Sequence, residues 1–170
     1  MSKKSFFWVS TGLLTLIVSL AIAFAEKSPA PPVSPDAPPP PVFVKSSELQ
    51  WKDASPALPK GAKVAVAFGD PAKGAYAQFV KIPKGYIFRP HYHTQPEWVA
   101  VISGRLAAGF GSEIDFNSAK ELSAGGSGYI PPGTPHWAMA RTEVLFYQYV
   151  AGIASVNYLN SADDPRAKPH

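Results

Sequence analysis

Short runs of hydrophobic residues, many of them alternating with polar ones, fill the chain from residue 63 to residue 160. Gly, Pro, Asn and Asp separate these runs. The runs are KVAVAFGDP (63–71), YAQFVKIPKG (76–85), YIFRPHYH (86–93), EWVAVISG (97–104), RLAAGFG (105–111), SGYIPPG (127–133), HWAMA (136–140), EVLFYQYVAG (143–152) and ASVNYLN (154–160). Many short β-rich runs with regular turn residues predict an all-β sandwich or barrel. Only FNSAKEL (116–122) allows a helical turn, and a loop is its alternative.

The first 25 residues have a different pattern, with one apolar stretch behind a basic start. MSKK precedes the run FFWVSTGLLTLIVSLAIA, and AFA (23–25), with small Ala23 and Ala25, comes before Glu26. This order predicts a signal peptide (residues 1–25) and export, to a periplasm or out of the cell. The run is also close to the length that spans a bilayer, so an uncleaved N-terminal membrane anchor is the alternative. Once the signal is cleaved, we expect no integral membrane role.

A proline-rich linker follows the predicted signal peptide and occupies residues 26–42. Its sequence KSPAPPVSPDAPPPPV (27–42) lacks an apolar pattern that could build a core. Such a composition favours an extended, semi-rigid tether. The remaining residues, 43–170, are enough for a single folded domain.

Charge and cysteine content exclude several classes of function. Loss of Lys3 and Lys4 with the signal peptide would lower the formal net charge from +4 to +2. The remaining Lys and Arg are scattered singly, so we expect no nucleic-acid binding. The absence of cysteine excludes disulfides and thiolate metal sites.

The stretch PHYHTQPEW (90–98) contains the candidate chemistry. His91 and His93 are two residues apart, so on a strand both rings point to the same face. Glu97 can return a carboxylate from the next strand, and a proline-glycine turn places His136 at the start of another. Three imidazoles and one carboxylate suit a divalent transition metal such as Fe, Mn, Ni, Cu, Co or Zn.

Two motifs around these donors resemble the signature motifs of the cupin superfamily. Residues 85–104 read G-x5-H-x-H-x3-E-x6-G, and residues 125–136 read G-x5-P-x-G-x2-H. The features FGDP (68–71) and DDPR (163–166) make the chain similar to one subgroup of single-domain cupins. That subgroup resembles the cupin half of zinc-containing anti-sigma factors. The resemblance implies a small cupin-type β-barrel (jelly roll) after the signal peptide and linker. One departure is Ala140, where the second motif usually has asparagine.

The resemblance also implies a metal site inside the barrel. Its ligands match His91, His93, Glu97 and His136 residue by residue, and the cofactor is one divalent transition metal (Fe, Mn, Ni or Zn). Single-domain cupins commonly form homodimers, so a homodimer is an expectation from the family.

Two classes of function fit a metal-binding cupin. The first is a metalloenzyme acting on a small oxygenated molecule as a dioxygenase, decarboxylase or isomerase, with Glu97 as a catalytic residue that takes a proton. The second is a non-catalytic module that binds a small-molecule ligand or senses stress. Four side chains would complete the coordination shell of zinc, whereas Fe, Mn or Ni would keep coordination positions open for a ligand. The sequence leaves this choice open.

The sequence also predicts the backbone conformation of five glycines and the surroundings of Gln148 and Arg89. Gly85, Gly104, Gly125, Gly128 and Gly133 are predicted at turns that require positive φ or close backbone approach. Gln148 is polar within an apolar run, so it needs a partner if it points inward. Arg89 shares strand parity with His91, but a bulge at Pro90 would leave it exposed.

Overall fold

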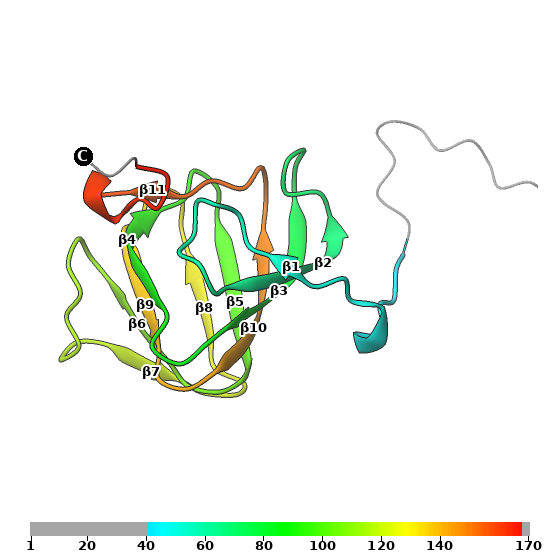
Figure 1. The fold of residues 1–170 in the computed structure, drawn as a ribbon, viewed down its shortest axis with the longest axis horizontal. Coiled ribbons are helices and arrows are strands. Elements are labelled where there is room, and N and C mark those ends of the chain that lie inside the picture. The colour runs from blue at the N-terminus through cyan, green and yellow to red at the C-terminus, as the bar shows by residue number, and fades with distance from the viewer. Residues whose placement is uncertain (1–40, 168–170) are drawn as a thin grey trace, which may run out of the picture. The chain divides into compact units, whose positions relative to one another are not determined.

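The computed structural model describes residues 41–167, which form two antiparallel β-sheets with short connections (Figure 1). The predicted signal peptide and residues 26–40 of the predicted linker lie outside the described residues. Two 3-10 helices, η1 (Ser46–Glu48) and η2 (Ser161–Asp163), complete the secondary structure described. Within residues 41–167, no helix has the length and apolar character needed to cross a membrane.

The larger sheet has six strands. In spatial order they are β1 (Lys52–Asp53), β2 (Lys63–Gly69), β3 (Tyr76–Ile82), β10 (Val144–Val150), β5 (Glu97–Ser103) and β8 (Ser127–Ile130). The smaller sheet has five strands. In spatial order they are β11 (Asn157–Tyr158), β4 (Ile87–Tyr92), β9 (His136–Ala140), β6 (Leu106–Phe110) and β7 (Lys120–Leu122).

The hydrophobic core lies between the two sheets. Ile82, Val101 and Val144 come from the larger sheet and are almost inaccessible to solvent. Leu106 and Ala140 contribute to the same cluster from the smaller sheet. In β3, Tyr76, Val80 and Ile82 are buried while Lys81 is exposed, because successive side chains of a strand point to opposite faces. The prediction of an all-β barrel of the jelly-roll type is confirmed. The helical turn considered for residues 116–122 is wrong at its end, where Lys120–Leu122 forms strand β7.

A β-bulge in β4 decides which side chains of that strand face inward. Pairing with β9 shifts register between Phe88 and His91, where Pro90 interrupts the ladder. Arg89 is therefore exposed, while His91 is buried. The bulge suspected at Pro90 is present, and it aims His91 into the barrel.

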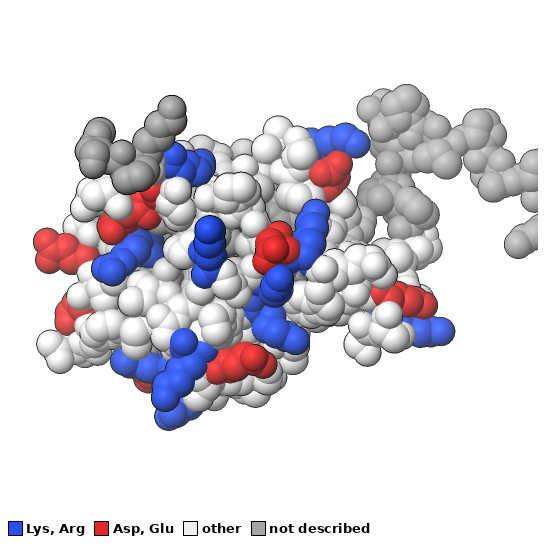
Figure 2. All heavy atoms as spheres, viewed as in Figure 1, with Lys and Arg blue, Asp and Glu red and all other residues white. Residues whose placement is uncertain are grey.

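Lysine and arginine residues are distributed among acidic residues on the face that Figure 2 shows. Several of them form surface ion pairs, such as Lys63 with Asp53 at 2.7 Å and Arg141 with Glu121 at 3.0 Å. The expectation that the domain does not bind nucleic acid stays a prediction.

Four of the five glycines have the backbone that was predicted. Gly85, Gly104, Gly125 and Gly133 have φ of +82°, +87°, +86° and +71°. The prediction is wrong for Gly128, which lies inside strand β8 and is absent from the residues with positive φ.

Replacing two of these glycines with alanine should separate backbone strain from steric conflict. At Gly85 a Cβ would meet nothing within 4 Å, so Gly85→Ala should cost about 1 kcal/mol from positive φ alone. At Gly104 a Cβ would lie 2.1 Å from the carbonyl oxygen of Glu143, so Gly104→Ala should cost clearly more. Urea titration measures both free energies of unfolding. Gly74→Ala is the control, because Gly74 has open space and no positive φ. Equal losses for Gly85→Ala and Gly104→Ala would contradict the steric argument.

Candidate metal centre

The four predicted donors lie near the ends of three strands. His91 is in β4, His93 directly follows that strand, Glu97 begins β5 and His136 begins β9. His91 and His136 are opposite each other in the β4–β9 pair. The backbone N–H of Gly133 donates to the carbonyl of His93 at 2.8 Å, which joins the two sequence motifs directly.

The side chains of these residues converge inside the barrel. Ring nitrogens of His91, His93 and His136 all lie within 4.8 Å of one another. Glu97 Oε2 lies 2.8 Å from His93 Nε2 and 3.8 Å from His136 Nε2. His91, His93 and Glu97 are buried, and His136 is nearly so. The structure therefore brings together all four side chains that the sequence singled out.

Backbone carbonyls orient all three imidazole rings. His91 Nδ1 lies 2.7 Å from the carbonyl oxygen of Arg89, and His136 Nδ1 lies 3.0 Å from that of Thr134. His93 Nδ1 contacts the carbonyl oxygen of Ser155. A carbonyl only accepts, so each Nδ1 carries the proton and donates it. Each Nε2 is then the atom that offers a lone pair, as in histidines that bind metals.

Two of these ring contacts have the same local geometry, in which a proline separates the histidine from its acceptor. His91 and His136 each follow a proline, in the stretches RPH (89–91) and TPH (134–136). In both, Nδ1 bonds to the carbonyl of the residue before that proline. The proline restricts the backbone between ring and acceptor, which helps hold the ring in place. His93 lacks a preceding proline, and its acceptor comes from Ser155, far along the chain.

The carboxylate of Glu97 is held at one oxygen and left unsatisfied at the other. Gln148 Nε2 donates to Oε1 at 2.6 Å, and Gln78 Nε2 donates to Gln148 Oε1 at 2.6 Å. Among the described residues, Oε2 of Glu97 is the buried side-chain polar atom that has no hydrogen-bond partner. His93 Nε2 lies 2.8 Å from this oxygen and forms an ion pair with it only when the ring is protonated.

Burial and mutual charge set the protonation of the cluster. Burial, together with the neighbouring His136 and His93 rings, lowers the pKa of His91 to about 3. Burial also lowers the pKa of His136. At His93 burial acts in the same direction, but the adjacent Glu97 carboxylate outweighs it and raises the pKa. At Glu97 burial would raise the pKa, and the His93 and His136 rings overcome it, so the pKa is lowered. The carboxylate is thus ionised near neutral pH.

The unsatisfied oxygen of Glu97 and the three oriented imidazoles fit a divalent transition metal. At bond lengths of about 2.1 Å, donors around one ion lie roughly 3 to 4 Å apart. The contacts from Glu97 Oε2 to His93 and His136, 2.8 and 3.8 Å, fall near this range. Nitrogen and carboxylate donors suit Fe, Mn, Ni and Zn alike, so the donor set leaves the identity of the metal open.

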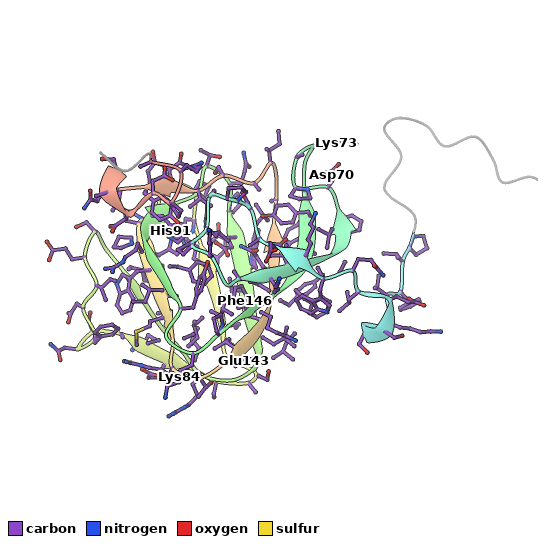
Figure 3. All side chains as sticks on the ribbon, in the orientation of Figure 1. Asp70, Lys73, Lys84, His91, Glu143 and Phe146 are labelled. Carbon is purple, nitrogen blue, oxygen red and sulfur yellow. The ribbon has the colours of Figure 1, made fainter. Side chains whose placement is uncertain are left out.

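The donors open into a cavity of about 750 Å³ inside the barrel. Figure 3 labels His91 on β4 and Phe146 on β10, both of which line it. Tyr76 and Gln78 also line it, from β3. Burial raises the pKa of Tyr76 to about 12, and the negative charge of Glu97 acts in the same direction. The Tyr76 hydroxyl therefore keeps its proton at neutral pH.

Sequence reasoning missed two residues that support the donors. Gln78 shares strand parity with Tyr76 and Val80, so a polar residue among inward-facing positions of YAQFVKI was a usable signal. Ser155 gave no such signal, because its contribution is a backbone carbonyl 62 positions from His93. Gln148, which was predicted to need a partner, has two.

The sequence matches the profile of one protein family. The profile of the family described as Cupin covers residues 71–156, which is slightly more than half of the chain and includes all four donors. No curated protein sequence gives a significant match.

Solved structures with the same fold share little sequence with this chain. The polyketide cyclase RemF from Streptomyces resistomycificus has a TM-score of 0.60 and 17% identity, over 73% of this chain and 89% of that one. An RmlC-like cupin protein from Ralstonia eutropha JMP134 has a TM-score of 0.56 and 20% identity, over 72% and 74%. KdgF from Halomonas sp. has a TM-score of 0.53 and 21% identity, over 66% and 94%. At these identities the likeness shows a shared fold.

Substitution of Gln148 should weaken metal binding without removing a donor. Gln148→Leu deletes the hydrogen bond that holds Glu97 Oε1, so we expect the affinity for Ni(II) to fall about 10- to 100-fold. Isothermal titration of the metal-free protein measures this change. Gln50→Leu, at an exposed position, is the matched control and should leave the affinity unchanged. Unchanged affinity in Gln148→Leu would mean that Glu97 needs no support.

Proposed function

This chain belongs to the cupin family, and from that premise we propose that it is a metal-dependent enzyme acting on a small oxygenated molecule. The observation that carries the proposal is the group of three histidines at the wall of a large cavity, with the buried, unsatisfied oxygen of Glu97 beside two of them, His93 and His136. Dioxygenase, decarboxylase and isomerase chemistry all fit such a site. The cavity volume lies within the range of small-molecule sites.

In this proposal, His91, His93, Glu97 and His136 hold one divalent transition metal. When bound, such a metal supplies Lewis-acid character and, for a redox-active ion, chemistry with O2. The carbonyl-bound Nδ1 atoms keep each Nε2 directed at the metal. Gln148 keeps Glu97 in place through Oε1 and leaves Oε2 free.

Two groups would act on the ligand. Glu97 would move its carboxylate off the metal, and Oε2 would then accept a proton from the ligand, as a catalytic residue. Tyr76 lines the same cavity and its hydroxyl keeps its proton, so it would donate a hydrogen bond to a ligand oxygen. The burial of His91, His93 and Glu97 keeps most of their surface away from solvent.

A non-catalytic ligand-binding or stress-sensing module is the second candidate. One observation favours it: among the described residues that line the cavity, the carboxylates are Glu97 and Asp53. Asp53 is paired with Lys63 at 2.7 Å on an exposed strand, so it is no dedicated base for a reaction at the donors. With zinc and four side-chain ligands, the site would be closed to substrate.

Export and pairing of two chains are part of the proposal. Export rests on the signal-peptide pattern of residues 1–25, with a membrane anchor as the alternative. A homodimer is an expectation from the family alone.

Metal analysis tests the proposal directly. Protein purified without added metal should contain about one equivalent of Fe, Mn or Ni by elemental analysis, with a visible spectrum that responds to small oxygen ligands. Stoichiometric zinc with no such response would favour the module. His91→Ala should weaken metal binding more than about 100-fold, since it removes a donor.

His170→Ala is the matched control, because it replaces the one histidine that is not among the predicted ligands. It should keep the full metal content. Full metal content in His91→Ala would show that the donors are assigned wrongly. Removal of the metal with a chelator should also lower the melting temperature, since binding to the folded state stabilises it.

A further inference from the structure

Two facing rows of residues form the level of the barrel directly beyond the donors. In the larger sheet, Gln78, Gln148, Val99 and Gly128 are successive partners across β3, β10, β5 and β8. In the smaller sheet, Phe88, Ala138, Ala108 and Lys120 are successive partners across β4, β9, β6 and β7. All eight line the cavity. This level lies between the donors and the packed core.

The row in the larger sheet changes from two glutamines to valine and glycine, and the row in the smaller sheet has two alanines between Phe88 and Lys120. Gln78 and Gln148 lie toward Glu97, and their amides are bonded to each other and to its carboxylate. Beyond them the wall consists of Val99 and Gly128 in one sheet and of the two alanines in the other. Small side chains on facing strands leave room where larger ones would fill the core.

Gly128 is the clearest sign of that room. It has the inward parity of Val99 and Ile130, while the adjacent Tyr129 packs on Trp98 on the outer face. A Cβ at Gly128 would meet nothing within 4 Å, and its backbone φ is outside the left-handed region. No turn and no close approach therefore requires glycine here. The absence of a side chain at Gly128 leaves the neighbouring part of the cavity open.

The fixed charges around the cavity argue against a highly charged ligand. Among the described lining residues, the Lys and Arg side chains are Lys52, Lys120 and Arg166, and all three residues are exposed. Lys52 and Lys120 lie on the edge strands β1 and β7. Arg166 is bound to Asp164 at 2.8 Å and to the carbonyl of Val156 at 3.0 Å. A dianion without an apolar part would find no buried cation beyond the metal.

We propose that the ligand of this site has an oxygen-bearing head and an uncharged apolar body, and that Gly128 sets the size of the body. The head lies beside the four donors and Tyr76, and the body fills the space bounded by Val99, Gly128, Ala108 and Ala138. This inference rests on the proposed function, because the head is placed by the metal centre.

Matched chelators test the size and character of the body. The full chain is loaded with Co(II), and its visible spectrum is titrated with acetohydroxamate, benzohydroxamate or oxalate. The first two have the same head, and the second adds an apolar ring. We expect benzohydroxamate to bind at least about tenfold more tightly than acetohydroxamate, and oxalate to bind more weakly than benzohydroxamate.

Substitution of Gly128 assigns this preference to the cavity. Gly128→Leu should reduce the preference for benzohydroxamate to about twofold or less, while acetohydroxamate affinity and cobalt content stay within about twofold of wild type. Gly128→Val, which suits a strand, should give an intermediate preference and serves if the leucine variant does not fold. Gly74→Leu is the control, since Gly74 also has open space and lies away from the cavity.

The outcomes separate this inference from the proposed function. If wild type holds cobalt but binds the two hydroxamates equally, or binds oxalate most tightly, the inference on the ligand is wrong and the metal centre stands. An unchanged preference in both Gly128 variants would also overturn it. A wild-type chain that holds no cobalt contradicts the proposed function, and this inference with it.

Discussion

The burial of one carboxylate is the constraint on which this structure depends. Glu97 is 5% exposed, and an ionised carboxylate removed from water is costly unless it is paired and hydrogen-bonded. The chain satisfies one of its oxygens with a glutamine that is itself fixed by a second glutamine. The other oxygen lies 2.8 Å from His93 Nε2 and 3.8 Å from His136 Nε2, and both rings donate from Nδ1 to backbone carbonyls. A cation at the meeting point of these donors would satisfy the charge that the protein leaves open.

The barrel supplies this arrangement through backbone geometry more than through further side chains. Two ring acceptors are carbonyls two residues earlier, each separated from its histidine by a proline. The third acceptor, at Ser155, belongs to the segment that leads into β11, and β11 pairs with β4 beside His91. Folding of the C-terminal segment is therefore coupled to the orientation of His93. The orientation of all three rings is therefore complete only when the segment that contains Ser155 and β11 has folded against β4.

The strand pattern and the four donors could be predicted because both are local in the sequence. Alternation within each run predicts its inward face, and the two motifs contain the donors. Strands β1 and β7, with two and three residues, are too short to show alternation. The role of Gly128 was mistaken, because a glycine between two turn-rich stretches resembles a turn residue. Its inward parity follows only from its pairing with Val99. The contribution of Ser155 could not be predicted, because it is a backbone carbonyl and no pattern of side chains indicates which carbonyl will accept.

The size of the cavity bears on the choice between a structural and a ligand-binding metal. A metal that only stabilises the fold needs its donors and no space for a ligand beside them. Here the level beyond the donors has glycine and alanine among its positions, and the cavity measures about 750 Å³. Larger side chains at those positions would fill part of it, and at Gly128 neither the backbone nor a neighbouring atom prevents one. Retention of the space, at the wall that carries the unsatisfied carboxylate oxygen, favours a site built to receive a molecule.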